Sequence, residues 1–163
     1  MAIIIRHQST AAQSSDPQVV PLAEWKGEAG VLLGSADNPA VIAGHLGRLR
    51  VVAIHFEQFT DGRGYTLARL LRERFGFMGE LRAVGEVLRD NLFYLRRCGF
   101  DSFVLSDQAD RETALESLST FSEAYQASVE RPEPLFRRRA ASALRGDHID
   151  WYTGPTLAEA LGL

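Results

Sequence analysis

The sequence predicts an α/β domain built around a mainly parallel β-sheet, and three observations indicate this fold. The chain has 163 residues, of which 45% are apolar and 24% are charged, as expected for one soluble globular domain. Between residues 30 and 126, short apolar runs alternate with stretches of helical periodicity. The apolar runs start near residues 31, 51, 81 and 102, and these spacings of 20, 30 and 21 residues leave room for a helical crossover between parallel strands.

We divide this single domain, residues 1–163, into an N-terminal extension (1–29), a βα-repeat core (30–126) and a C-terminal segment (127–163). In the extension, the apolar run at residues 3–5 predicts a short strand, and the polar stretch at 8–18 predicts a surface loop. Residues 19–22 supply a second strand, so we expect a small N-terminal hairpin.

The first half of the core predicts a strand, a helix and a second strand. Residues 31–33 form an apolar run, and Asn38 followed by Pro39 is typical of a helix start. That helix presents one apolar face, made by Ile42, Leu46 and Leu49. Residues 51–56 give the strongest strand signal in the chain because they are rich in β-branched and aromatic side chains.

The second half of the core repeats the alternation. Strands are predicted at residues 80–84 and 103–105. Three further helices are indicated by apolar stripes at helical spacing. Their stripes are Leu67, Leu70, Leu71 and Phe75, ending at Gly76; Leu88, Leu92 and Leu95, ending at Gly99; and Ala114, Leu118, Phe121 and Tyr125.

Beyond residue 125 the pattern loosens, and short helices are expected at 137–145 and 156–161. The core supplies four βα units, half the number in a (β/α)₈ barrel. We therefore favour a partial TIM-like barrel, because no strand is followed by a dinucleotide-binding fingerprint. An open doubly wound sheet is the alternative.

In either architecture the loops after parallel strands share one edge, where ligands bind. The four loops here are 34–38, 60–65, 85–87 and 106–108. The second loop reads Asp-Gly-Arg-Gly-Tyr, so its glycines let a ligand approach the backbone and Arg63 offers a guanidinium fork for an anion. Alternatively, the glycines form a tight turn, Asp61 caps the next helix, and Arg63 lies in water.

Other polar groups have two interpretations each. His55 and Glu57 are two apart in a strand, where they would share a face, but a core or interface histidine is favoured over a metal or catalytic one. Glu86 and Asp90 are four apart at a helix start and suit either acid–base chemistry or the helix dipole. Cys98 precedes a helix-ending glycine and is expected to be buried and structural.

Charge and cysteine content limit the class of protein. The net charge of −3 argues against nucleic acid as a partner, and the basic run 137–139 is expected to be a solvated helix face. One cysteine makes no internal disulfide, and no metal-ligand spacing is present. No apolar run is long enough for a membrane span or a signal sequence, so we expect a cytoplasmic protein.

Several motifs in combination resemble the bacterial domain-of-unknown-function family 934. They are Asp61–Tyr65, Ala68–Arg72, Gly79–Gly85, Leu88–Asp90 and Leu95–Asp101. The resemblance is close over residues 50–106 and looser over most of the remaining chain. Proteins of this family are commonly encoded beside sulfite reductase and other sulfate-assimilation enzymes, and some are labelled oxidoreductases of sulfite reduction.

The resemblance implies an enzyme or accessory protein of sulfite reduction or sulfate assimilation, which we expect to bind a small anion at the strand ends. The ligand-binding candidates are Gly62, Arg63, Gly64, Tyr65, Arg82 and Gly85, and the catalytic candidates are Asp61, Glu86 and Asp90. No cofactor is evident, and an oxidoreductase would need a bound redox group because one thiol cannot cycle as a dithiol. The alternative is a non-catalytic module that docks on sulfite reductase or another sulfur-assimilation enzyme, or that forms a homo-oligomer.

Overall fold

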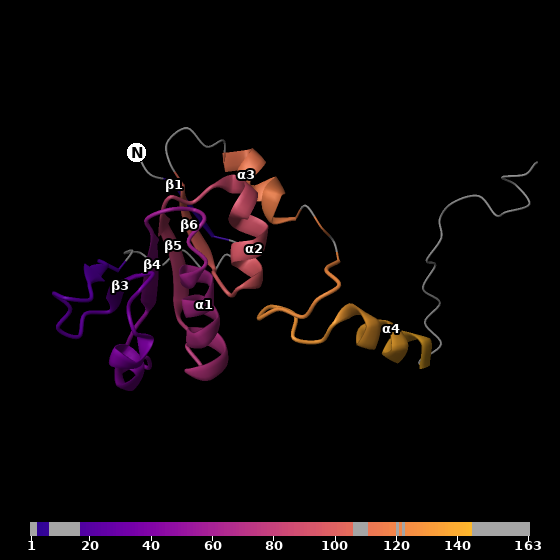
Figure 1. Cartoon of the computed structure of the whole chain (residues 1–163), viewed down its shortest axis with the longest axis horizontal. Helices are drawn as coiled ribbons and strands as arrows, with labels where there is room; N and C mark the ends of the chain where they lie inside the picture. The colour runs from indigo at the N-terminus through magenta and orange to yellow at the C-terminus, as the bar shows by residue number, and fades with distance from the viewer. Residues whose placement is uncertain (1–2, 7–16, 106–110, 120, 122, 145–163) are drawn as a thin grey trace, which may run out of the picture.

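The computed structural model describes residues 3–6, 17–105, 111–119, 121 and 123–144 (Figure 1). Its centre is a six-stranded sheet in the order β1-β6-β5-β4-β3-β2. The strands are β1 Ile3–Arg6, β2 Val20–Pro21, β3 Gly30–Gly34, β4 Val51–Phe56, β5 Glu80–Gly85 and β6 Ser102–Leu105. Neighbouring strands from β2 to β6 are parallel, whereas β1 is antiparallel to β6. The mainly parallel α/β sheet is therefore confirmed.

The expected N-terminal hairpin is wrong, because β1 and β2 lie at opposite edges of the sheet. β1 pairs with β6, where Ile5 is buried in the core opposite Phe103. β2 pairs with β3, with Val20 opposite Val31. Thirteen residues separate Arg6 from Val20, enough chain to cross the five inter-strand gaps of about 24 Å in total. Burial of Ile5 next to β6 therefore outweighs local pairing.

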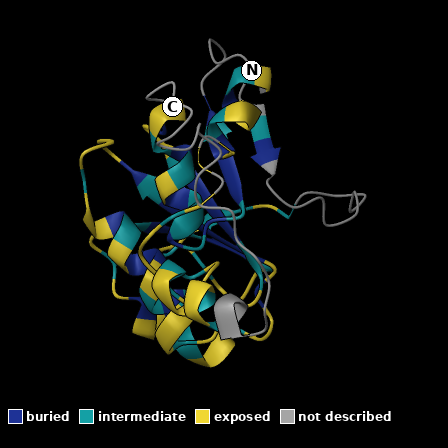
Figure 2. Cartoon of the chain, turned by 90° about the vertical axis from the view of Figure 1, so that its right-hand side faces the viewer, coloured by how far each residue is buried: buried dark blue, intermediate teal, exposed yellow. Residues whose placement is uncertain are grey.

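Helices cover one face of the sheet (Figure 1). They are the 3₁₀ helix η1 Pro39–His45, α1 Arg63–Arg69 with its π-helical continuation η2 Leu70–Arg74, the 3₁₀ turn η3 Arg89–Asn91 leading into α2 Leu92–Arg97, and α3 Arg111–Leu118. Alternate strand residues such as Val52 and Leu81 share one hydrophobic core with Leu71 and Leu95 of the helices. In Figure 2 the strands are buried while the outer helix surfaces are exposed.

The helix boundaries follow the predicted signals in the first three crossovers. The Asn38 side chain accepts a hydrogen bond from the N–H of Ala40 at 3.0 Å and so caps η1. Gly76 and Gly99 have φ of +64° and +103°, the left-handed conformation that ends a helix. The fourth helix is shorter than predicted, since α3 ends at Leu118 and the N–H and hydroxyl of Ser119 both bond to the Glu116 carbonyl.

The C-terminal segment contains α4 Leu135–Leu144, which confirms the first of the two expected helices. The other, at 156–161, lies outside the described residues. Phe121 and Tyr125, which were expected on the buried stripe of the fourth helix, are exposed. Figure 1 shows α4 standing apart from the sheet.

Consecutive core strands are also spatial neighbours, so the strand order from β2 to β6 contains no reversal. A doubly wound sheet requires a reversal and places helices on both faces. Neither feature is present among the described elements. All the parallel strands therefore direct their carboxyl ends to one edge.

Candidate functional site

Loops from three neighbouring strands meet at the carboxyl edge of the sheet. We call this edge the rim and define it as residues 34–38, 57–64 and 85–88. The Ser35 hydroxyl donates to Asp61 Oδ2 at 2.6 Å and joins the loops after β3 and β4. The Phe59 N–H donates to Glu86 Oε2 at 3.0 Å and joins the loops after β4 and β5. The predicted convergence of these loops is confirmed, while the loop at 106–108 lies outside the described residues.

Asp61 and Arg63 form a fixed ion pair on the rim. Arg63 Nε donates to Oδ1 at 2.9 Å, Nη2 donates to Oδ2 at 2.8 Å, and the Arg63 backbone N–H donates to Oδ1 at 3.1 Å. The hydrogen bonds from Arg63, and then the one from Ser35, hold the pKa of Asp61 well below its usual range. Asp61 is therefore ionised near neutral pH, and its lowered pKa makes it a weaker base than an ordinary carboxylate. The Arg63 side chain remains 63% exposed.

The rim glycines serve packing around Phe56. A Cβ at Gly64 would lie 2.5 Å from Phe56 Cε1, and a Cβ at Gly85 would lie 2.3 Å from the Phe56 carbonyl oxygen. Gly85 also has a φ of +93°, which favours glycine. Gly62 differs, because among the described residues no atom beyond its two chain neighbours lies within 4 Å of the position of its Cβ. Open space therefore exists beside the backbone next to Arg63.

Glu86 and Asp90 do not form the predicted pair on one helical turn. Glu86 lies in the loop, Leu88 is extended with φ −98° and ψ 147°, and η3 begins only at Arg89. The helical spacing of four therefore does not apply to these two carboxylates. Asp90 pairs with its neighbour Arg89 at 3.3 Å and is highly exposed. Glu86 is the carboxylate candidate that the structure places on the rim with a backbone partner from another loop.

Of two further ligand-binding candidates, Tyr65 packs against the core and Arg82 extends away from the rim. Tyr65 packs its ring against Phe56 and Tyr94, with centroid distances of 5.2 and 5.1 Å, and burial raises the pKa of its hydroxyl. Arg82 is only 4% exposed, and its guanidinium donates to Glu80 Oε1 at 2.7 and 3.0 Å. Because Glu80 precedes Arg82 in β5, this side chain extends toward the amino end of the strand, opposite to the rim.

His55 lies at the carboxyl end of β4, opposite Gly34 in the sheet register. Its ring is 3.0 Å from the position that a Cβ of Gly85 would take. Glu57 directly follows the end of β4 at Phe56, so it lies one residue beyond the strand that holds His55. Within the described residues, no three His, Cys, Asp or Glu side chains are placed to hold a metal ion.

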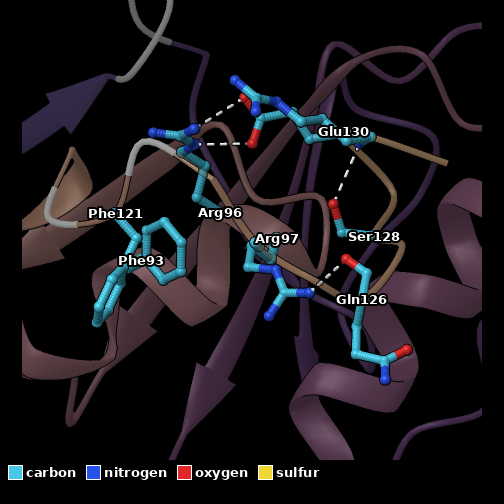
Figure 3. A pocket seen from close by; sticks show the side chains of 9 residues that line it. Phe93, Arg96, Arg97, Phe121, Gln126, Ser128 and Glu130 are labelled. Atoms are coloured by element: carbon cyan, nitrogen blue, oxygen red, sulfur yellow. Dashed lines mark hydrogen bonds and ion pairs between the residues drawn. The ribbon is translucent and has the colours of Figure 1, made fainter. Parts of the chain in front are cut away.

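No pattern in the sequence indicates a second polar site, which lies between α2 and residues 121 and 123–131 (Figure 3). Arg96 and Glu130 form a two-point ion pair there, with distances of 2.9 and 3.0 Å. They are 34 positions apart in the sequence, so no local spacing pattern indicates the contact. A hollow lined by Phe93, Arg97 and Phe121 lies beside this pair.

Cys98 is buried, as expected, and burial raises the pKa of its thiol. Its neighbours on α2 therefore do not create a reactive thiolate. Among the helices of the described ranges, none has the length and apolar character needed to span a membrane.

A family model for a bacterial protein of unknown function, DUF934, matches residues 30–136. The chain belongs to this family. Searches of curated proteins and of solved structures give no match. The DUF934 match begins at β3 and ends at the start of α4, so it contains the whole described rim.

Proposed function

We propose that the protein binds a small oxyanion on the rim, as an enzyme or accessory protein of sulfite reduction or sulfate assimilation. The observation that carries the proposal is the exposed guanidinium of Arg63, held in one orientation by Asp61. Two of its N–H groups are used by this pair, and the remaining ones are available for an oxyanion. The open space beside Gly62 gives the ligand access.

Asp61 has two opposite effects on the binding of an anion by Arg63. Asp61 lowers the entropy cost of binding because Arg63 is already positioned, but its negative charge offsets that of the guanidinium. Glu57 and Glu86 add further negative charge to the rim. We therefore expect weak binding, with a dissociation constant on the order of millimolar. Glu86 is the acid–base candidate that we retain if a reaction takes place on the rim.

Calorimetric titration with sulfite, sulfate and phosphate tests the proposal. Arg63→Ala is expected to abolish the heat that the wild-type protein gives with at least one of these anions. Arg69→Ala is the matched control, because Arg69 is also exposed, lies on the same helix and pairs with Glu73 at 3.0 Å. Equal heats for wild type and Arg63→Ala would refute the rim site. A flavin or iron band in the visible spectrum of the purified protein would support a redox enzyme.

We infer further that the sheet corresponds to part of a TIM-like barrel. The sequential strand order and the position of the helices on one face support this inference. In such a barrel, ligands bind where the rim lies.

A docking module, bound to sulfite reductase, to another sulfur-assimilation enzyme or to a second copy of the chain, is the second candidate function. It is favoured by the large exposed side chains of the C-terminal segment, Phe121, Tyr125 and Phe136. Light scattering and capture with purified sulfite reductase test it. A monomer that does not bind the reductase would count against this function.

A further inference from the structure

The walls of the hollow beside α2 are held in place by hydrogen bonds within the chain. The hollow lies between the end of α2 and residues 121 and 123–131 (Figure 3), and its enclosed part has a volume of about 20 Å³, while the rest opens to solvent. Arg96 stabilises one wall of the hollow with all three nitrogens of its guanidinium. Nε and Nη2 donate to Glu130, and Nη1 donates to the Leu118 carbonyl at 2.5 Å. The Val129 N–H also donates to the Arg97 carbonyl at 3.1 Å. The segment is thus tied to α2 by side chain and backbone.

Arg97 differs from Arg96 because most of its donors are unused. Its Nη2 donates to the Gln126 carbonyl at 3.0 Å. Its Nε is buried and has no hydrogen-bond partner. Because Nε is closed to solvent, a ligand in the hollow would accept from Nη1, for which the described residues supply no acceptor. Arg97 therefore has capacity for an acceptor that the described part of the chain does not supply.

The same hollow has an apolar wall. The rings of Phe93 and Phe121 lie with their centroids 5.2 Å apart, and Phe121 is 61% exposed. The Arg97 guanidinium lies 6.0 Å from the centre of the Phe93 ring. Of the three arginines in the lining, Arg96 pairs with Glu130 and Arg131 pairs with Glu123, so Arg97 supplies the positive charge that no ion pair among the described residues offsets. Positive charge beside a partly uncovered aromatic ring suits an anion with a flat apolar body.

We propose that this hollow binds a small aromatic or similarly flat carboxylate. The carboxylate accepts from Arg97, and the apolar body covers Phe121. Arg96 and Glu130 position the wall without contacting the ligand. The site is separate from the rim and does not depend on the function proposed there.

Benzoate, acetate and benzamide are the probes, and the readout is the NMR signal of the Arg97 Nε–H group. Benzoate should shift this signal, with a dissociation constant on the order of millimolar. Acetate lacks the ring and should bind about five-fold more weakly. Benzamide lacks the charge and should leave the signal in place. A benzoate titration that does not move the Arg97 signal overturns the proposal.

Variants separate binding from structure. Arg97→Lys keeps the positive charge but loses the guanidinium, so benzoate should bind at least several-fold more weakly. Because Val129 bonds to the backbone carbonyl of residue 97, its amide signal reports whether the segment remains docked in the variant. Arg63→Ala, on the rim, should bind benzoate like the wild type. Unchanged binding by Arg97→Lys, or loss of binding in Arg63→Ala, would contradict the assignment.

Discussion

Arg72 joins three parts of the fold at the amino end of the sheet, and its replacement by methionine should destabilise the protein strongly. Its Nε donates to the Gly99 carbonyl at 3.0 Å, and its Nη1 donates to the carbonyls of Phe77 and Gly79 at 2.5 and 2.9 Å. Its Nη2 bonds to the Asp101 carboxylate. Methionine keeps most of the apolar stem but removes all four contacts.

The expected loss follows from burial. Only 13% of the Arg72 side chain is exposed, so the three carbonyls lose charged donors where water has limited access. Asp101 is 45% exposed, and water therefore replaces part of its lost partner. Each charged hydrogen bond contributes about 1.5 to 3 kcal/mol, and partial rehydration reduces the sum. We expect the free energy of unfolding to fall by about 3 to 5 kcal/mol, a large share of the stability of a typical domain.

Urea unfolding followed by circular dichroism measures this loss. The control is Arg69→Met, because Arg69 lies one turn earlier, pairs with Glu73 at (i, i+4), and is 57% exposed. That substitution should cost about 0.5 kcal/mol or less. If Arg72→Met and Arg69→Met lower the unfolding midpoint equally, the four hydrogen bonds of Arg72 do not stabilise the fold as we expect.

Three other predictions concern the rim and α2. Gly85→Ala should lower the free energy of unfolding by about 1 to 3 kcal/mol, because the new Cβ meets the Phe56 carbonyl and φ is positive; an unchanged unfolding midpoint would be inconsistent with this packing. The lowered pKa of Asp61 stabilises the fold above about pH 4, the unfolded-state range, and this contribution is lost as the pH falls further. The stability of Asp61→Asn should therefore depend less steeply on pH below about pH 4, and parallel pH profiles would argue against the ion pair. Cys98 should react with a thiol reagent at neutral pH only after unfolding, since burial raises its pKa; rapid modification of the native protein would contradict this.

Much of the core could be predicted because its signals are local. The run at residues 51–56 is β-branched and apolar, and Asn38, Gly76 and Gly99 mark helix ends through their own side chains or backbone conformations. Once the strands were parallel, the convergence of Ser35, Asp61 and Glu86 on one edge followed from geometry. Predicting that these loops meet requires only the direction of the strands and no knowledge of side-chain packing.

The errors arose where distant parts of the chain compete with local pattern. The run at residues 3–5 is a strand, as predicted, but its partner β6 is about a hundred residues away. The spacing of Glu86 and Asp90 suggested a helix, whereas the positive φ of Gly85 and the extended Leu88 keep the chain out of helical conformation. Arg82 was assigned to the rim on resemblance alone, and its contact with Glu80 extends it the other way.

The pairing of β1 with β6 also has a consequence for the order in which the molecule assembles. During synthesis, Ile3 and Ile5 leave the ribosome about a hundred residues before Phe103 and Leu105, so β1 cannot pair with β6 until those later residues are made. Closing so long a loop is slow compared with forming the adjacent βα units. Docking of β1 is therefore expected to be a late step, and until then the aliphatic side of β6 is open to other nascent chains.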